Sequence, residues 1–258
     1  MFGLKTARNL QKYVQVEWED GLLAKFSYVW LRDNARRRPS LVHLDLNTRP
    51  QEIKCSREAL EVQWPPFIAS RYTSNFLRDI ALDSPVERLY GAHRGRQNGQ
   101  FGRRNRIRQI LLGRGSARAG HNLAAPRQKS LRLSFVDVEK VLFEMRERYP
   151  KHLVFLGTCV LEYAEGPFFA THPVVRVDDQ GHILPGFFNN AARSSAITVH
   201  SLDELYEALQ KFGRVCAENI CDIQLMPGQR LFFNNIRGMI GAPAQTGRNL
   251  SIKCLAYC

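Results

Sequence analysis

The sequence predicts a mainly β fold with flanking helices, of the α+β class. Short apolar segments, separated by turns rich in Pro, Gly and Asp, recur along the chain and are typical of strands. Only a few segments show the three-to-four-residue spacing of apolar side chains that is typical of an amphipathic helix. A chain of 258 residues with 44% hydrophobic residues can bury the core of one large domain or of two smaller ones.

Residues 1–87 are expected to form a small β-rich domain. A hairpin is predicted from Tyr13 to Trp30, with its turn at Glu19-Asp20-Gly21 and its second strand from Leu22 to Trp30. Two further elements are predicted here, a strand from Glu61 to Trp64 and a helix from Ser70 to Ile80.

Residues 88–134 differ in composition from the rest of the chain. They contain 12 Lys or Arg and no Asp or Glu, so they supply nearly all of the formal net charge of +13. The segment is rich in Arg, Gly, Gln and Asn with little apolar periodicity, and we expect it to be irregular or disordered. Its charge suits non-specific nucleic-acid binding with a steep salt dependence. Its aromatic residues, Tyr90 and Phe101, are too few to favour base stacking.

Residues 135–258 show a clearer pattern of helices and strands. Asp137 is placed to begin a helix, and the pair Ser201 and Glu204 forms a capping box for a second helix that runs to about Ala217. The predicted buried positions on these two helices are Val138, Val141, Leu142, Met145, Leu205, Leu209 and Phe212. Strands are predicted at 153–156, 173–177, 183–188, 223–226, 230–235 and 250–257.

Two separated blocks carry recognisable motifs. The first is Val29-Trp30-Leu31-Arg32-Asp33-Asn34, and the second runs from about Phe135 to Tyr257 and includes Phe187-Phe188-Asn189-Asn190-Ala191-Ala192-Arg193. In this order they resemble the gamma-butyrobetaine hydroxylase and trimethyllysine dioxygenase family of Fe(II)/2-oxoglutarate dioxygenases. The resemblance implies that family's N-terminal domain, followed by an incomplete TauD-like domain at 135–258, a double-stranded β-helix of the jelly-roll type.

The resemblance also implies a site and its chemistry. Family members hydroxylate a trimethylammonium amino acid in carnitine biosynthesis with Fe(II) and 2-oxoglutarate, and they form homodimers. By alignment, Arg248 grips the far carboxylate of 2-oxoglutarate, a role that suits its planar guanidinium. Asn189, Asn190 and Arg193 match the motif that holds the substrate carboxylate. Without the alignment, a turn at the end of a strand is the simpler interpretation of the two Asn residues.

The chain departs from this family at the metal sites. Ile240 stands where the family has its distal iron-binding His, and the expected His-x-Asp would fall near the acid-free segment 88–134. The sequence His43-Leu44-Asp45 does have that spacing, but it lies in the N-terminal domain, where a surface strand explains it better. Residues 35–40 contain no Cys, so no structural zinc is expected.

Three interpretations follow from these residues. The chain is a carnitine-pathway dioxygenase of weak or absent activity, a non-catalytic pseudoenzyme or a splice or gene-model fragment, or a non-specific nucleic-acid-binding protein that uses residues 88–134. We predict no catalytic residue and no metal ligand at the family positions.

The spacing of the Cys residues and the composition of the first 16 residues bear on the cellular compartment. The six Cys show no C-x-x-C spacing, which predicts reduced thiols. The stretch from Met1 to Val16 has no acid and carries Lys5, Arg8 and Lys12, a pattern compatible with a mitochondrial presequence. A basic N-terminal strand in a cytoplasmic protein is the alternative. No apolar run is long enough to span a membrane.

Overall fold

The computed structural model describes residues 2–36, 38–83, 119–124, 130–165, 168–180, 182–186, 188–197, 199, 201–234, 237–241 and 251–256. The chain divides into two compact units that interleave along the sequence. Unit 1 draws on residues 1–108, 161–171 and 189–207, and unit 2 on residues 109–160, 172–188 and 208–258. This division differs from the consecutive boundaries 1–87, 88–134 and 135–258 expected from the sequence. The predicted α+β class is confirmed, with small antiparallel sheets and a few helices.

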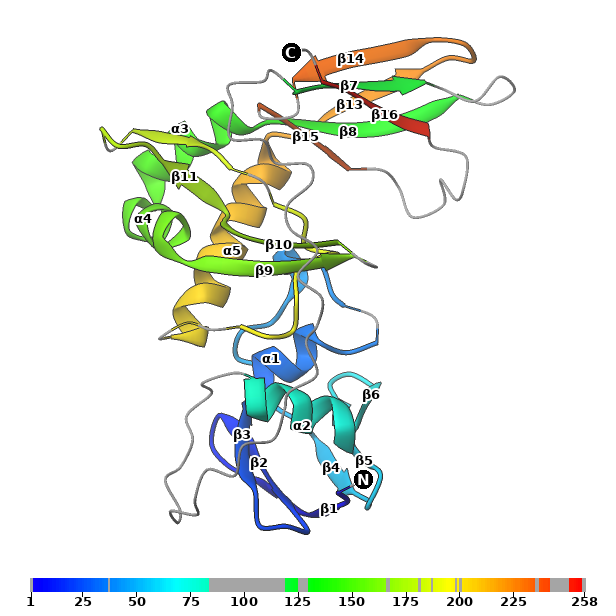
Figure 1. Ribbon diagram of the computed structural model, residues 1–258, viewed down its shortest axis with the longest axis vertical. Coiled ribbons are helices and arrows are strands. Elements are labelled where there is room, and N and C mark those ends of the chain that lie inside the picture. Colours follow the sequence, from blue (N-terminus) through cyan, green and yellow to red (C-terminus); the bar gives the residue numbers. More distant parts are fainter. Residues whose placement is uncertain are drawn as a thin grey trace. The chain divides into compact units, whose positions relative to one another are not determined.

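Two three-stranded sheets form the N-terminal part of unit 1 (Figure 1). The first contains β1 (Leu4–Asn9), β2 (Tyr13–Trp18) and β3 (Leu23–Ser27), and the second contains β4 (Glu52–Cys55), β5 (Ala59–Trp64) and β6 (Ile68–Thr73). Apolar side chains alternate along β2 and β5, as strands with one buried face require. The buried residues of these two strands include Val14, Val16, Trp18, Leu60, Val62 and Trp64.

Helix α1 (Tyr28–Asp33) corrects the predicted second strand of the hairpin. The strand ends at Ser27, whose side chain accepts a hydrogen bond from the backbone N of Trp30 at 3.2 Å. This N-cap begins a helix at Tyr28, so the strand prediction was wrong for residues 28–30. The helix buries Trp30 and Asp33, which are 2% and 0% exposed.

The helix predicted from Ser70 to Ile80 is confirmed only in its second half. Residues up to Thr73 belong to β6, and α2 (Ser74–Asp83) follows. Ser70 and Tyr72 are both buried and two residues apart, which is the spacing of a strand. The Ser70 hydroxyl accepts a hydrogen bond from Trp64 Nε1 at 3.1 Å, and this bond lies between paired strands.

A second part of unit 1 comes from the middle of the chain. Strand β9 (Val160–Glu165) pairs with β10 (Phe168–Pro173). The backbone N of Ala164 donates to Ala192 O at 2.7 Å, and the N of Ser194 donates to Glu162 O at 2.8 Å. Residues 192–194 therefore run alongside β9, although no strand was predicted there.

The helices after residue 135 confirm two predictions and correct a third. Asp137 caps α3 (Val138–Arg148), and the Ser201 hydroxyl accepts from Glu204 N at 3.2 Å at the start of α5 (Leu202–Glu218). The predicted apolar stripes of both helices are buried. The strand predicted at 153–156 is instead part of helix α4 (Pro150–Thr158). Pro150 begins this helix, where its fixed φ is favourable, and does not merely follow the preceding one.

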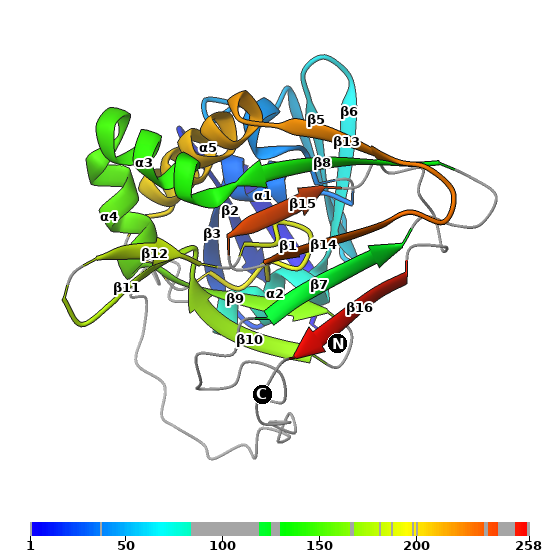
Figure 2. The ribbon, with the colours of Figure 1, turned by 90° about the horizontal axis from the view of Figure 1, so that it is seen from above.

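Two three-stranded sheets face each other in unit 2 (Figures 1 and 2). One has β8 (Leu131–Asp137) between β13 (Cys221–Leu225) and β15 (Gly238–Gly241), and the other has β7 (Ala119–Ala124) between β14 (Arg230–Asn234) and β16 (Ser251–Ala256). Leu231 and Phe233 of β14 pack against Leu131, Leu133 and Leu225 of the first sheet. This contact fixes the two sheets face to face.

The segment 88–134 contains more regular structure than predicted. Residues 119–124 form β7 and residues 131–134 begin β8, so the irregular interpretation was wrong for these residues. The alternation of Leu131 and Leu133 around Arg132 is a strand pattern that the high Arg content of the segment obscured. Residues 88–118 and 125–129 lie outside the described part of the chain.

The hairpin predicted around Asp178 is confirmed by β11 (Val175–Val177) and β12 (Ile183–Pro185). None of the helices in the described ranges is long and apolar enough to cross a membrane.

Candidate functional site

Ile240 is half-buried on β15 and packs against the apolar core. It lies in register with Phe135 of β8, and its side chain packs against the cluster formed by Leu131, Leu133 and Leu225. The two sheets come close here, because the ring of Phe135 on β8 meets the ring of Phe233 on β14 edge to face, with centroids 5.9 Å apart. A Cβ added at Gly238 would lie 3.2 Å from Phe233 and only 2.5 Å from the Phe135 ring on the neighbouring strand. The side chain of Ile240 therefore contributes packing between the sheets.

The described residues around Ile240 do not fit an iron site. Fe(II) in a facial triad takes imidazole and carboxylate ligands, whereas the cluster against which Ile240 packs is aliphatic and aromatic. In the described ranges no group of three or more His, Cys, Asp or Glu is placed to hold a metal ion. No chemical step through iron follows from these residues.

The His43-Leu44-Asp45 sequence lies in a short loop of unit 1. Leu41–His43 forms one turn of 3-10 helix, and Leu44 is buried. The Asp45 carboxylate accepts a hydrogen bond from the backbone N of Asn47 at 2.9 Å. These contacts give Asp45 a local role in the loop.

Arg193, a predicted substrate-binding residue, is buried in unit 1. Its Nη2 donates to Asp33 Oδ2 at 2.8 Å, and both side chains are 0% exposed. The Tyr206 hydroxyl donates to the same carboxylate oxygen at 2.9 Å. Asp33 belongs to the first resemblance block and Arg193 to the second, so the structure joins the two blocks through one buried carboxylate.

The side chains of Asn189 and Asn190 are both engaged within their own turn. Asn189 Oδ1 accepts from the backbone N of Ala191 at 3.0 Å and of Ala192 at 3.3 Å. Asn190 Oδ1 accepts from Arg193 Nε at 3.2 Å. This geometry is that of an Asx-type turn, which the sequence offered as the simpler interpretation. The binding of a substrate carboxylate by these residues stays a prediction.

The buried cluster also shifts the pKa of its members. Burial, together with the Asp33 carboxylate, raises the pKa of the Tyr206 phenol. Burial lowers the pKa of Arg193, but Asp33 and Tyr206 more than offset this and the net pKa is raised. Burial lowers the pKa of Arg38, whose guanidinium lies near Asp33 and Arg193. Both arginines remain cationic at any physiological pH.

Sequence reasoning missed Arg38 and Tyr206 and did not assign a role to Asp33. A signal did exist for Asp33, because an acid within the apolar stretch of residues 28–33 must find a buried partner. Tyr206 gave a weaker signal, since it sits beside Leu205 on the predicted apolar face. Nothing in the sequence marked Arg38 among its neighbouring arginines.

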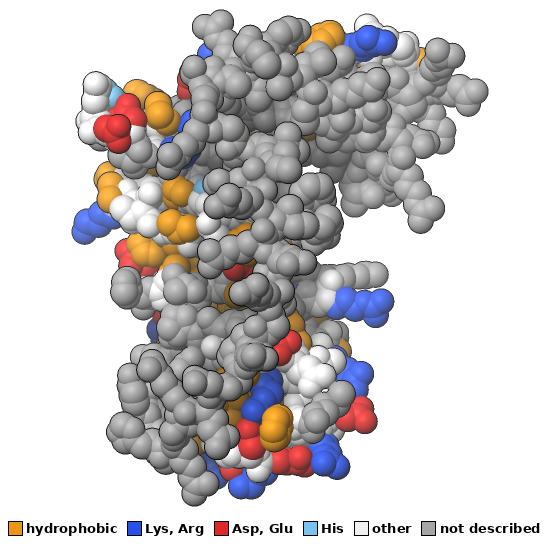
Figure 3. Space-filling model, viewed as in Figure 1, with side chains coloured by type: hydrophobic (Ala, Val, Ile, Leu, Met, Phe, Trp, Pro, Cys, Tyr) orange, Lys and Arg blue, Asp and Glu red, His pale blue; other side chains and the backbone are white. Residues whose placement is uncertain are grey.

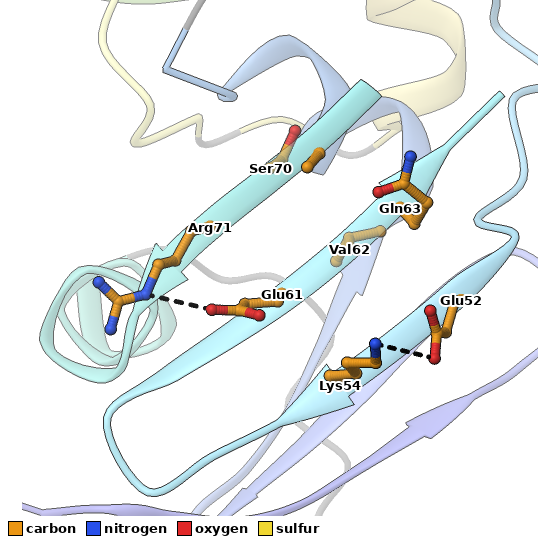
Figure 4. A pocket seen from close by; sticks show the side chains of 8 residues that line it. Glu52, Lys54, Glu61, Val62, Gln63, Ser70 and Arg71 are labelled. Atoms are coloured by element: carbon orange, nitrogen blue, oxygen red, sulfur yellow. Dashed lines mark ion pairs between the residues drawn. The ribbon is translucent and has the colours of Figure 1, made fainter. Parts of the chain in front are cut away.

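The outer face of the sheet β4-β5-β6 holds a shallow hollow of about 280 Å³ (Figure 4). Its charged side chains pair with each other, Lys54 with Glu52 at 3.2 Å and Arg71 with Glu61 at 3.5 Å. All four are largely exposed and their charges balance. Such a face resembles a solvated sheet surface and offers no unpaired charge to a ligand.

Charges on the described surface are mixed in sign. On the face drawn in Figure 3, cationic and acidic side chains intermingle at the end that holds β1–β6. The described ion pairs there include Lys5 with Glu17 and Arg57 with Glu19. Nucleic-acid binding by residues 88–134 therefore stays a prediction about a segment that lies mostly outside the described residues.

Arg248, the predicted 2-oxoglutarate anchor, lies outside the described residues, and so does His93. The binding of 2-oxoglutarate by Arg248 therefore also stays a prediction.

Residues 133–242 match the family model described as taurine catabolism dioxygenase TauD, TfdA family. This family generally uses Fe(II) and 2-oxoglutarate, so the matched region is similar to a non-haem iron dioxygenase. The match runs from β8 to the end of β15 and includes Ile240. Comparison with curated proteins gives no match to the chain.

Proposed function

We propose that this chain is a relative of the gamma-butyrobetaine hydroxylase type of dioxygenase that has lost hydroxylation. Two observations support descent from such an enzyme, the TauD-family match over residues 133–242 and the order of the two motif blocks. The loss of hydroxylation is inferred from Ile240, a half-buried apolar side chain that packs against the core cluster at the position of a metal ligand in the resemblance. A facial triad that lacks this ligand keeps at most two protein ligands.

In this proposal the two facing sheets of unit 2 are what remains of a double-stranded β-helix. Arg248 keeps an attachment point for the carboxylate of 2-oxoglutarate, through a bidentate pair of hydrogen bonds. Asn189 and Asn190 lie in the segment that would meet the carboxylate of a trimethylammonium amino acid of the carnitine pathway. A homodimer in mitochondria is part of the same proposal.

The test combines metal binding with turnover on the purified full chain. Isothermal titration with Fe(II) under anaerobic conditions should give no stoichiometric site, and succinate release from 2-oxoglutarate should not exceed the background without protein. Stoichiometric iron together with substrate-dependent succinate would overturn the proposal.

A binding assay separates the cosubstrate anchor from catalysis. We expect 2-oxoglutarate to bind without iron, and Arg248→Ala to weaken that binding by at least about tenfold, because a charge-assisted bidentate contact is lost. The exposed Arg214→Ala is a matched control and should bind as the unaltered protein does. Equal affinity of the Arg248→Ala variant would remove Arg248 from the site.

A further inference from the structure

The side chain of Arg38 joins the loop after α1 to the backbone of residues 190–193. Its Nη1 donates to the backbone O of Asn190 at 2.6 Å and of Arg193 at 2.9 Å. Its Nη2 donates to Asn34 Oδ1 at 3.0 Å, and its Nε donates to Asp33 O at 3.3 Å. One guanidinium thus serves four acceptors, three of which are backbone carbonyls.

These carbonyls lie in irregular backbone, where neither a sheet nor a helix supplies a donor. Residues 192–194 use one edge of their backbone for β9, through Ala192 O and Ser194 N. The carbonyls of Asn190 and Arg193 are satisfied by Arg38 instead. A carbonyl buried without a donor costs free energy, so the segment depends on this side chain.

A second set of contacts ties the same two segments together. Asn34 Oδ1 accepts from the Ser195 hydroxyl at 2.6 Å, and Trp30 Nε1 donates to Ser195 O at 3.0 Å. Asn34 is thereby shared between Arg38 and Ser195. The buried Asp33–Arg193 ion pair lies next to these bonds, with Arg38 Nε 3.7 Å from Asp33 Oδ1.

We propose that Arg38 is a latch that fixes residues 189–195 against the end of α1 and so sets the conformation of the Asn189–Asn190 turn. The inference rests on these contacts alone and is independent of the proposed function. A lysine cannot replace the latch, because an ammonium is a compact point charge without the planar fork that reaches divergent acceptors. Loss of the Arg38 hydrogen bonds would make both the Asn189–Asn190 turn and the loop after α1 more mobile, because these bonds connect the two segments.

Hydrogen–deuterium exchange of the full chain tests the latch. In Arg38→Lys, backbone amides in peptides covering residues 188–197 should exchange at least about tenfold faster than in the unaltered protein. Peptides covering β1 to β3 should keep their rates. The matched control is Arg36→Lys, in the same loop but with an exposed side chain, and it should leave residues 188–197 protected.

Two results would overturn the proposal. One is unchanged exchange of residues 188–197 in a folded Arg38→Lys protein, and the other is equal acceleration in Arg36→Lys. Asn34→Ala, compared with Ser195→Ala, serves if Arg38→Lys does not fold. Asn34→Ala removes the acceptor of both Arg38 and Ser195, whereas Ser195→Ala removes only the Ser195 bond. Asn34→Ala should accelerate exchange in the same peptides more than Ser195→Ala does, and equal rates in these two variants contradict the latch.

Discussion

Asp33 and Arg193, 160 positions apart in the chain, form an ion pair of 2.8 Å in which both side chains are inaccessible to solvent. Burial removes the hydration of the carboxylate and of the guanidinium, and this cost is offset only while the two groups remain paired. Tyr206 supplies a further hydrogen bond to the carboxylate. The pair therefore makes the N-terminal helix α1 dependent on a segment much later in the sequence.

Removing the negative charge of this pair should destabilise the protein strongly. Asp33→Asn keeps the shape of the side chain but leaves the Arg193 guanidinium buried without a counter-ion. We expect the free energy of unfolding to fall by about 3–5 kcal/mol. Urea denaturation followed by tryptophan fluorescence measures this change.

The control for this prediction is the exposed ion pair of Lys12 with Asp203, whose N–O distance is 3.3 Å. Lys12→Gln should change the free energy of unfolding by less than about 1 kcal/mol, because solvent screens the pair. Similar losses in Asp33→Asn and Lys12→Gln would contradict a dominant role for the buried carboxylate.

Substitutions at Ile240 distinguish a packing position from a metal position. Ile240→Val should lower the free energy of unfolding by about 0.5–1.5 kcal/mol through the lost methylene. Ile240→His should lower it by about 1–2 kcal/mol, because an imidazole at this half-buried position loses part of its hydration against Leu131, Leu133 and Leu225. Ile220→His, at a position 49% exposed, is the matched control and should have little effect. Tight Fe(II) binding gained by Ile240→His would show instead that two other ligands are already in place.

Gly238 tests the close packing around β15, both beside β8 and against the facing sheet. Gly238→Ala places a methyl group against the rings of Phe135 and Phe233, and we expect a loss of about 1–3 kcal/mol from overpacking. Gly228→Ala offers a contrast, because no atom lies within 4 Å of its added Cβ and only its positive φ of 83° opposes the change. Its cost should be about 1–2 kcal/mol and should come from backbone strain alone. Shortening the nearest neighbour with Phe135→Leu should restore stability to Gly238→Ala and not to Gly228→Ala.

The buried tyrosines predict a loss of stability at high pH. Burial raises the pKa of Tyr72 to about 12, whereas an unfolded tyrosine titrates near about 10. The folded protein thus holds a proton that the unfolded chain releases, so this contribution is complete below about pH 10 and is lost as the pH rises toward 12. The raised pKa of Tyr206 acts in the same direction. Urea denaturation at pH 8, 10 and 11 should show the decline.

Tyr72→Phe removes one of these titrating groups. Its free energy of unfolding should be lower at pH 8, because the hydrogen bond from Tyr72 to Leu31 O is lost, but should fall less steeply between pH 10 and 11. Parallel pH slopes in the two proteins would contradict the assignment to Tyr72.

Helices and hairpins whose caps, turns and apolar spacing all lie within a few residues could be predicted from the sequence. The Asp137 and Ser201 caps and the apolar stripes that follow them define α3 and α5 without help from the rest of the chain. The hairpin of β2 and β3 was predictable for the same reason, since its turn and its alternation lie within a few residues. Such signals depend only on neighbours in sequence.

Errors arose where one local pattern supports two structures. The apolar residues from Leu153 to Leu156 are compatible with a strand as well as with a helix. Pro150 lies in the first turn of α4, a position that favours the helix. Ser70 and Tyr72 became strand residues because β5 was available as a partner, which is a tertiary effect. The family motif located Arg193, but only long-range contacts show that its partner is Asp33.

The interleaving of the two units has a consequence for synthesis on the ribosome. The sheets of β1 to β6 leave the exit tunnel early, yet Asp33 and the latch formed by Arg38 find their remaining partners only when residues 190–206 have emerged. Until then α1 carries a carboxylate that must stay hydrated, so the early sheets cannot close over it. Completion of unit 1 is therefore a late step that waits for Tyr206, and a nascent chain stopped after residue 83 would remain open to chaperones and proteases.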